Sequence, residues 1–241
     1  MKIIADTHSH TVVSGHAYST MKEMASAAAK NGLEVLALTE HAPQMPGTCG
    51  AFYFRNYQVV PRKQCGIQLL LGSEVNIMGL DGSVDLEEDT LQLQDIVIAS
   101  IHMPCFGLDK TMAENTQAYL NAMKNPYINI IGHPDDGRFP VDMEALVLGA
   151  KATNTLLEIN NSSLMPNGFR KNAYENASRM LHYCKQYDVS VTVGSDAHID
   201  IDAGNFKNAI QLLETCNFPE RLVANTSLKK LEPYINAYKC N

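Results

Sequence analysis

The sequence predicts an α/β fold in which strands and helices alternate around a parallel sheet. Short apolar runs that suit strands alternate with amphipathic stretches from one end of the chain to the other. The length of 241 residues also suits an α/β barrel, which commonly occupies about 200 to 250 residues as one domain. We therefore expect a single domain over residues 1–241.

Seven segments are predicted to be strands. Each is short and apolar, and each is bounded by polar or turn-forming residues. The seven are Lys2–Asp6, Glu34–Thr39, Ile67–Gly72, Ile96–Ser100, Ile128–Gly132, Leu156–Asn160 and Ser190–Gly194.

Helix signals lie between these strands. Thr20 with Glu23 and Thr111 with Glu114 have the spacing of a capping box, which marks the start of a helix. Asp142 is expected to cap a third helix. A fourth is expected around Asn172–Gln186.

Residues 42–66 interrupt this alternation, because prolines and glycines punctuate the segment and its aromatic residues show no clear period. We expect a long loop here, part of which forms a wall or lid over the functional site. The Asp81-Gly82 pair predicts a hairpin turn between Val75–Met78 and Ser83–Leu86.

Composition excludes several classes of protein. Hydrophobic residues make up 45% of the chain and charged residues 19%, which is typical of a globular protein. The net charge of −7 and the lack of a Lys/Arg run argue against a protein that binds the phosphate backbone of a nucleic acid through a basic surface. No apolar stretch suits a secretory signal or a membrane span. The six cysteines lie at least sixteen residues apart, so we expect reduced thiols and a cytoplasmic location.

Seven of the eight histidines come just after the carboxyl end of a predicted strand, and only His182 lies within a predicted helix. Glu74 and Asp196 also follow strand ends. In a barrel of parallel strands these ends converge on one face, where active sites are built. The candidate metal ligands are His8, His10, His16, His41, Glu74, His102, His133, Asp196 and His198.

The spacing of these residues indicates shared metal ions. In His8-Ser9-His10 the alternation of a strand end directs both imidazoles to the same side, and Asp196-Ala197-His198 repeats that pattern. Imidazole and carboxylate ligands without a thiolate suit zinc, manganese or iron. Any one histidine could be a hydrogen-bonded loop residue, but seven at equivalent positions favour ligands, and nine ligands imply two or three ions.

These motifs resemble, in chain order, the metal-binding motifs of the PHP (polymerase and histidinol phosphatase) family. The resemblance covers essentially the whole chain and is strongest to the small stand-alone bacterial probable phosphatases of the YcdX type. Two positions depart from the family pattern: Glu40 stands where many relatives carry Asp, and Ala51–Phe54 replaces a stretch that contains histidine in some relatives. The motifs are Asp6-x-His8-x-His10, Thr39-Glu40-His41, Glu74, His102, His133 and Gly194-Ser195-Asp196-Ala197-His198.

The resemblance implies a distorted (β/α)7 TIM-like barrel with a trinuclear metal site at the C-terminal ends of its strands. It implies three divalent ions, with zinc as the first candidate and manganese or iron as alternatives. The first ion is expected on His8, His10, Glu74 and Asp196; the second on Glu74, His102 and His133; the third on His16, His41 and His198.

The expected function is that of a metal-dependent phosphatase that hydrolyses small phosphomonoesters through a metal-bridging hydroxide. No nucleophilic triad or nucleotide-binding loop points to a covalent phosphoenzyme. Three divalent ions would offset most of the charge of −7, so an anionic substrate is compatible with an acidic chain.

Two further residues are candidates for catalysis. Asp6 is expected to orient a ligand histidine or a water molecule, the alternative being that it only ends its strand. Arg170 is a candidate phosphate contact, the alternative being a solvated surface arginine. Arg138 and Ser162 are additional candidates for that contact.

Other functions stay open from the sequence. An amidohydrolase shares the His-x-His opening but typically uses a lysine on its fourth strand, where this chain has His102. A metal-dependent phosphodiesterase or nuclease, a histidinol-phosphate phosphatase, and a metal-binding structural domain are the remaining alternatives. A homo-oligomer is also left open.

Overall fold

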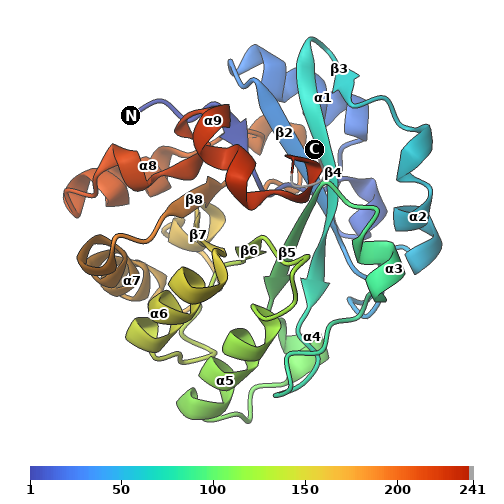
Figure 1. Cartoon of the computed structure of the whole chain (residues 1–241). Helices are drawn as coiled ribbons and strands as arrows, with labels where there is room; N and C mark the ends of the chain where they lie inside the picture. Colours follow the sequence, from blue (N-terminus) through green and yellow to red (C-terminus); the bar gives the residue numbers. More distant parts are fainter. Residues whose placement is uncertain (239–241) are drawn as a thin grey trace.

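Seven parallel strands form a nearly closed barrel in the computed structural model, which describes residues 1–238 (Figure 1). The strand order β1-β2-β4-β5-β6-β7-β8 follows the chain, so each parallel strand pairs with the next parallel strand in the sequence. A short strand, β3 (Lys63–Gln64), pairs antiparallel with β4. The parallel strands are β1 (Ala5–Asp6), β2 (Val35–His41), β4 (Ile67–Asn76), β5 (Ile96–Ser100), β6 (Ile130–Ile131), β7 (Leu156–Asn160) and β8 (Val191–Gly194).

Helices cover the outside of these strands, and α5 to α8 line one side of the barrel in Figure 1. Both predicted capping boxes are confirmed, and the Asp142 carboxylate accepts two backbone N–H bonds at the start of α6. The helices are α1 (Met21–Lys30), α2 (Ala51–Arg55), α3 (Glu88–Leu91), α4 (Met103–Phe106), α5 (Met112–Ala122), α6 (Met143–Thr153), α7 (Ala173–Tyr187), α8 (Lys207–Thr215) and α9 (Leu228–Leu231).

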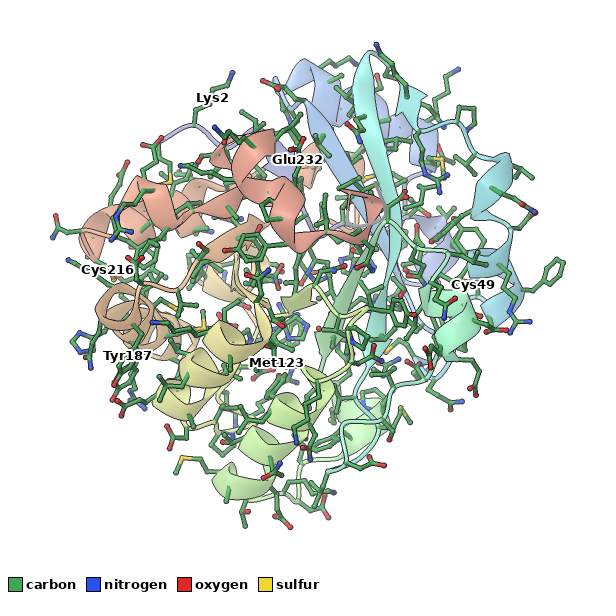
Figure 2. The ribbon with its side chains drawn as sticks, viewed as in Figure 1. Lys2, Cys49, Met123, Tyr187, Cys216 and Glu232 are labelled. Atoms are coloured by element: carbon green, nitrogen blue, oxygen red, sulfur yellow. The ribbon has the colours of Figure 1, made fainter. Side chains whose placement is uncertain are left out.

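Alternate residues of the strands β2 and β4 to β7 belong to two different hydrophobic cores. Leu69 and Leu71 pack in the large core shared with the helices, whereas Leu70 belongs to a smaller core inside the barrel. Leu231 and Ile235, from the C-terminal segment, close that inner core. Figure 2 shows side chains filling the space between strands and helices. The inner core thus occupies one end of the barrel and leaves the carboxyl ends of the strands for polar side chains.

Asn225 joins β8 to β1, the two strands at the ends of the sheet. Its side-chain amide donates to the carbonyls of Ala5 and Val193 at 2.8 and 2.7 Å, and its Oδ1 accepts from Val193 N–H at 3.1 Å. Its backbone carbonyl accepts a further bond from Ile4 N–H. One fully buried side chain therefore supplies hydrogen bonds that a strand pair would otherwise make.

The expectation of a long loop over residues 42–66 is wrong for its second half. Residues 51–64 contain α2, a 3₁₀ turn at Tyr57–Val59 and β3. The rings of Tyr53, Phe54 and Tyr57 pack nearly at right angles, with centroids 5.4 to 5.8 Å apart. Phe54 and Tyr57 are buried in the large core and Tyr53 packs against it. They come from α2 and from the 3₁₀ turn that follows it, so they follow neither a single helical period nor a strand period along the sequence.

The predicted hairpin at Asp81-Gly82 is reduced to one antiparallel bridge between Ile77 and Val84. The five cysteines among the described residues are free, and Cys240 lies outside them. No helix within residues 1–238 is long and apolar enough to span a bilayer.

Replacing Asn225 by alanine should weaken the closure of the barrel. The change leaves backbone groups of Ala5 and Val193 buried without partners, so we expect the free energy of unfolding to fall by about 3 kcal/mol. Chemical denaturation measures this, with Asn167→Ala at an exposed loop position as the control. Equal stability of the two variants would contradict the assigned role of Asn225.

Candidate metal centre

Glu74 lies at the centre of the histidine cluster. It follows Leu70 by four residues on β4, so its side chain points into the barrel on the face that Leu70 shares. The residue is 1% exposed. Its two carboxylate oxygens face different imidazoles: Oε1 lies 2.9 and 3.2 Å from Nε2 of His133 and His102, and Oε2 lies 2.8, 3.4 and 3.5 Å from nitrogens of His41, His8 and His10.

The surrounding imidazoles keep this carboxyl ionised. Burial by itself would raise the pKa of Glu74, but electrostatic attraction to the imidazoles of His102, His8 and His41, with a hydrogen bond from His102, outweighs it and holds the pKa well below its usual range. A buried carboxylate therefore stands between two groups of nitrogen ligands. This is the arrangement by which one carboxylate can bridge two cations.

His8 and His10 approach Asp196 on one side of Glu74. The Nε2 atoms of the two histidines are 3.1 Å apart, and they lie 3.6 and 3.4 Å from Asp196 Oδ1. Burial would raise the pKa of Asp196, yet the positive charges of His8 and Arg170 hold it well below its usual range. His8, His10, Glu74 and Asp196, expected from the sequence to share an ion, are thus brought together.

Hydrogen bonds fix the outward nitrogen of several imidazoles. His8 Nδ1 donates to Glu158 Oε1 at 2.7 Å, and His102 Nδ1 donates to Asn76 Oδ1 at 2.7 Å. His10 Nδ1 lies 3.1 Å from the hydroxyl of Ser14. With Nδ1 held in this way, the lone pair of Nε2 is directed inward, as in many protein metal sites.

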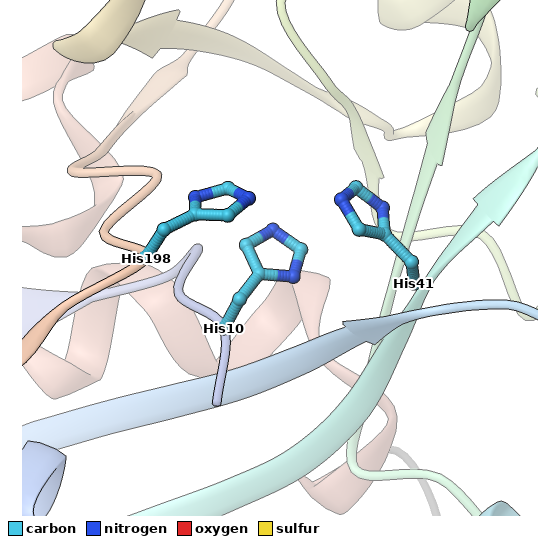
Figure 3. A group of neighbouring side chains, drawn as sticks. All are labelled: His10, His41 and His198. Atoms are coloured by element: carbon cyan, nitrogen blue, oxygen red, sulfur yellow. The ribbon is translucent and has the colours of Figure 1, made fainter. Parts of the chain in front are cut away.

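His16, His41 and His198 form a third group, in which His16 and His198 lie nearer the solvent. His41 shares the Oε2 side of Glu74 with His8 and His10. The Nε2 atoms of His16 and His41 are 3.2 Å apart, and the ring centroids of His16 and His198 are 4.9 Å apart. His10 stands beside this group, with its ring 4.2 Å from that of His41 and 4.4 Å from that of His198. Figure 3 shows His10, His41 and His198 converging from the ends of three different strands.

Within residues 1–238, three sets of side chains have ligand atoms close enough to hold a metal ion: His10, His41 and His198; His8, His10 and Glu74; His41, Glu74 and His102. Burial lowers the pKa of His10, His16 and His102, which favours the neutral imidazole that binds metals.

Buried polar atoms without a hydrogen bond also indicate a metal site. Among residues 1–238, no donor is oriented to hydrogen-bond Glu74 Oε2, although the atom is buried. His133 and Asp196 also hold positive φ angles of 28° and 54°. Unsatisfied buried atoms and strained backbone at one place are typical of a site built for a ligand, so the residues present fit divalent cations.

Both carboxylate oxygens of Asp6 are bonded to the backbone. Oδ1 accepts from the N–H groups of His8 and Ser195, and Oδ2 accepts from Gly204 N–H at 3.0 Å. Burial raises the pKa of Asp6 to about 6. Asp6 thereby fixes the backbone on which His8 stands and ties the end of β1 to the loop after β8. A direct contact with a ligand imidazole or a water molecule stays a prediction.

Arg170 is buried, not a solvated surface arginine, since its side chain is only 7% exposed. Its Nη2 donates to Asp196 Oδ2 at 3.1 Å, and its Nη1 lies near Asn160 Oδ1 and Ser163 Oγ. The structure therefore gives Arg170 a contact that positions Asp196. A phosphate contact by Arg170 stays a prediction.

Glu158 is the residue that the sequence reasoning missed. Its Oε1 accepts from His8 Nδ1, and its Oε2 accepts from the backbone N–H of His133 at 2.8 Å. A Cβ atom at Gly194 would lie 2.1 Å from Glu158 Oε1, so the glycine makes room for the carboxylate. The available signal was a single charged residue flanked by Leu157 and Ile159 in a short predicted strand.

A pocket of about 500 Å³ opens onto these ligands. Its wall includes Arg138, Ser162 and Arg170, as well as Met45 from the segment expected to cover the site. The volume suits one small molecule.

The fold and the site together define a parallel barrel with a histidine- and carboxylate-rich candidate metal centre at the carboxyl ends of its strands. The PHP domain family model matches residues 6–191, and the chain belongs to this family. A probable phosphatase of Thermoanaerobacter sp. is 43% identical over 239 residues, which cover 99% of this chain and 97% of that protein. One of Clostridium novyi is 44% identical over 237 residues, covering 98% and 96%.

A solved structure has a similar fold. It is histidinol phosphate phosphatase from Lactococcus lactis, complexed with zinc, L-histidinol and phosphate. The TM-score is 0.62 at 20% sequence identity, and the match covers 89% of this chain and 94% of that one. The TIM-like barrel expected from the sequence is thereby confirmed.

Glu158→Gln should weaken metal binding while every direct ligand is kept. The change removes the charge that holds His8 Nδ1–H, and we expect zinc affinity to fall by about 10- to 100-fold. Competition with a chromophoric chelator measures the dissociation constants. Glu214→Gln, on the exposed face of α8, is the matched control and should retain wild-type affinity. Unchanged affinity in Glu158→Gln would show that the His8–Glu158 bond has no part in the site.

Proposed function

We propose that this protein is a metal-dependent phosphatase that hydrolyses small phosphomonoesters at a trinuclear metal site. The relatives that match nearly the whole chain are named probable phosphatases, and the similar solved structure contains zinc and phosphate. The observation that carries the proposal is the placement of the two Glu74 oxygens against two separate groups of imidazoles.

We assign the metal ligands as follows. Glu74 would be shared by two ions, one of which would be held also by His8, His10 and Asp196 and the other by His102 and His133. A third ion would be held by His16, His41 and His198. Imidazole nitrogen and carboxylate oxygen suit zinc, which we propose as the ion, although the same donors accept manganese or iron.

Bound divalent ions lower the pKa of a coordinated water and neutralise phosphoryl oxygens, the two requirements for hydrolysis of a phosphate ester. The residues around the ligands orient the ligand side chains. Glu158 and Asn76 fix the rings of His8 and His102, and Arg170 holds Asp196 so that only Oδ1 faces the ligand histidines. These contacts keep the site in one geometry before the substrate arrives.

The pocket favours a small phosphorylated substrate over a polymer. It has room for one small molecule, and the chain as a whole is acidic, with a net charge of −7. The similarity to histidinol phosphate phosphatase, at 20% identity, supports the fold and does not select histidinol phosphate from among other small phosphomonoesters.

The catalytic part of the proposal is tested with a panel of phosphate esters and metal-loaded protein. We expect hydrolysis of small phosphomonoesters, and a fall in kcat/KM of at least about 100-fold in His133→Ala, because the variant loses a ligand on the Oε1 side of Glu74. His182→Ala changes a histidine on the exposed side of α7 and should retain full activity. Inactivity of the wild type across the panel, or full activity of His133→Ala, would contradict the proposal.

Metal content tests the trinuclear assignment separately. Elemental analysis of protein purified without chelator should find close to three divalent ions per chain, and His198→Ala should hold about one ion fewer, since it removes a ligand of the solvent-facing group. His182→Ala is again the matched control. Fewer than two ions in the wild type would count against a multinuclear site.

A further inference from the structure

The pocket above the metal centre has two unlike halves. Its inner half is formed by the candidate ligands and Arg170. Its outer half also contains Arg138, Ser162 and Asp202, but it is mostly apolar. The apolar residues come from three separate segments: Met45 after β2, Met103 and Pro104 at the start of α4, and Phe169 in the connection between β7 and α7. The sequence places these residues far apart, and the barrel brings them around one opening.

Three of these apolar residues, Met103, Pro104 and Phe169, are exposed to solvent. Phe169 is 67% exposed and Met103 is 49% exposed. Single exposed apolar residues are ordinary on protein surfaces, but an apolar surface that several segments build around one pocket is typical of a ligand site. Because this surface and the candidate ligands line the same pocket, the surface is placed to contact the group attached to a phosphate held at the metal centre.

Phe169 is held in place at the opening. The guanidinium carbons of Arg138 and Arg170 lie 4.8 and 5.0 Å from the centroid of its ring. Arg170 is anchored to Asp196, and Arg138 is anchored to Asp136 through Nε and Nη2. These contacts fix the ring next to the metal centre without burying it.

The charges of the outer half are also informative. Arg138 is neutralised by its ion pair with Asp136, and the other charged side chain in this half is Asp202. The described residues that line the outer half therefore present no unpaired cation to a second phosphate or to a carboxylate. The surface suits an uncharged apolar group.

We propose that the outer half of the pocket binds the alcohol portion of the substrate and selects phosphomonoesters whose alcohol is apolar and carries no second anionic group. Phe169 is the specificity-determining residue of this surface. The inference rests on the proposed phosphatase function and names the substrate class for it.

The test compares two esters of primary alcohols, 2-phenylethyl phosphate and glycerol 1-phosphate, so that the reactivity of the leaving groups is similar. We expect wild-type kcat/KM to be about tenfold or more higher for 2-phenylethyl phosphate, the order that a few apolar contacts contribute to specificity. Phe169→Ala should lower kcat/KM for this ester about tenfold more than for glycerol 1-phosphate. Phe52→Ala changes another exposed phenylalanine, on α2 and outside the pocket; it is the matched control and should retain the wild-type preference.

Binding gives a second readout that needs no turnover. Calorimetry with metal-loaded protein should show tighter binding of 2-phenylethylphosphonate than of ethylphosphonate, and Phe169→Ala should remove that difference. Equal kcat/KM for the two esters, or an equal loss for both in Phe169→Ala, overturns the inference while the phosphatase function stands. No hydrolysis of either ester by metal-loaded protein overturns the phosphatase function and this inference together.

Discussion

The candidate site depends on one buried carboxylate, that of Glu74. A carboxylate without compensation is costly to bury, and here the compensation comes from imidazoles on both sides of the group. Each oxygen faces a different set of imidazole nitrogens, so the carboxylate lies between the two sets and contacts both. Without Glu74 the imidazoles would share one polar cavity with no anion between them, and two adjacent cations would repel each other.

The fold places Glu74 at this point through the two-residue period of a strand. Among the residues of β4 that face the barrel interior, Leu70 lies in the inner core and Glu74 lies four residues later, near the open end. β7 follows the same pattern, with Leu156 in the core and Glu158 near the site. Asn225 closes the barrel between β1 and β8, and this brings the loop of His8 and His10 next to that of Asp196 and His198. Local strand geometry and barrel closure together produce the site.

Much of this could be predicted from the sequence, because strand ends are marked by local signals. The seven strands, the two capping boxes and the gathering of seven histidines on one face all follow from short-range patterns that a barrel preserves. Glu158 was missed because its role depends on the space that Gly194 leaves across the sheet, which the sequence around either residue does not show. Helix α2 was missed because five residues, three of them aromatic, carry too little periodicity to indicate a helix. Contacts between distant segments, such as that of Phe169 with Arg138, could not be predicted either, because the local sequence does not show which distant residues meet.

The bridging role of Glu74 is tested most directly by a crystal structure of the zinc-loaded protein, with diffraction data collected on both sides of the zinc absorption edge. Two anomalous peaks about 3.5 to 4 Å apart should flank the Glu74 carboxylate, one next to each oxygen. A third should lie among His16, His41 and His198. A single peak, or peaks that leave the Glu74 oxygens without a metal, would contradict the central claim.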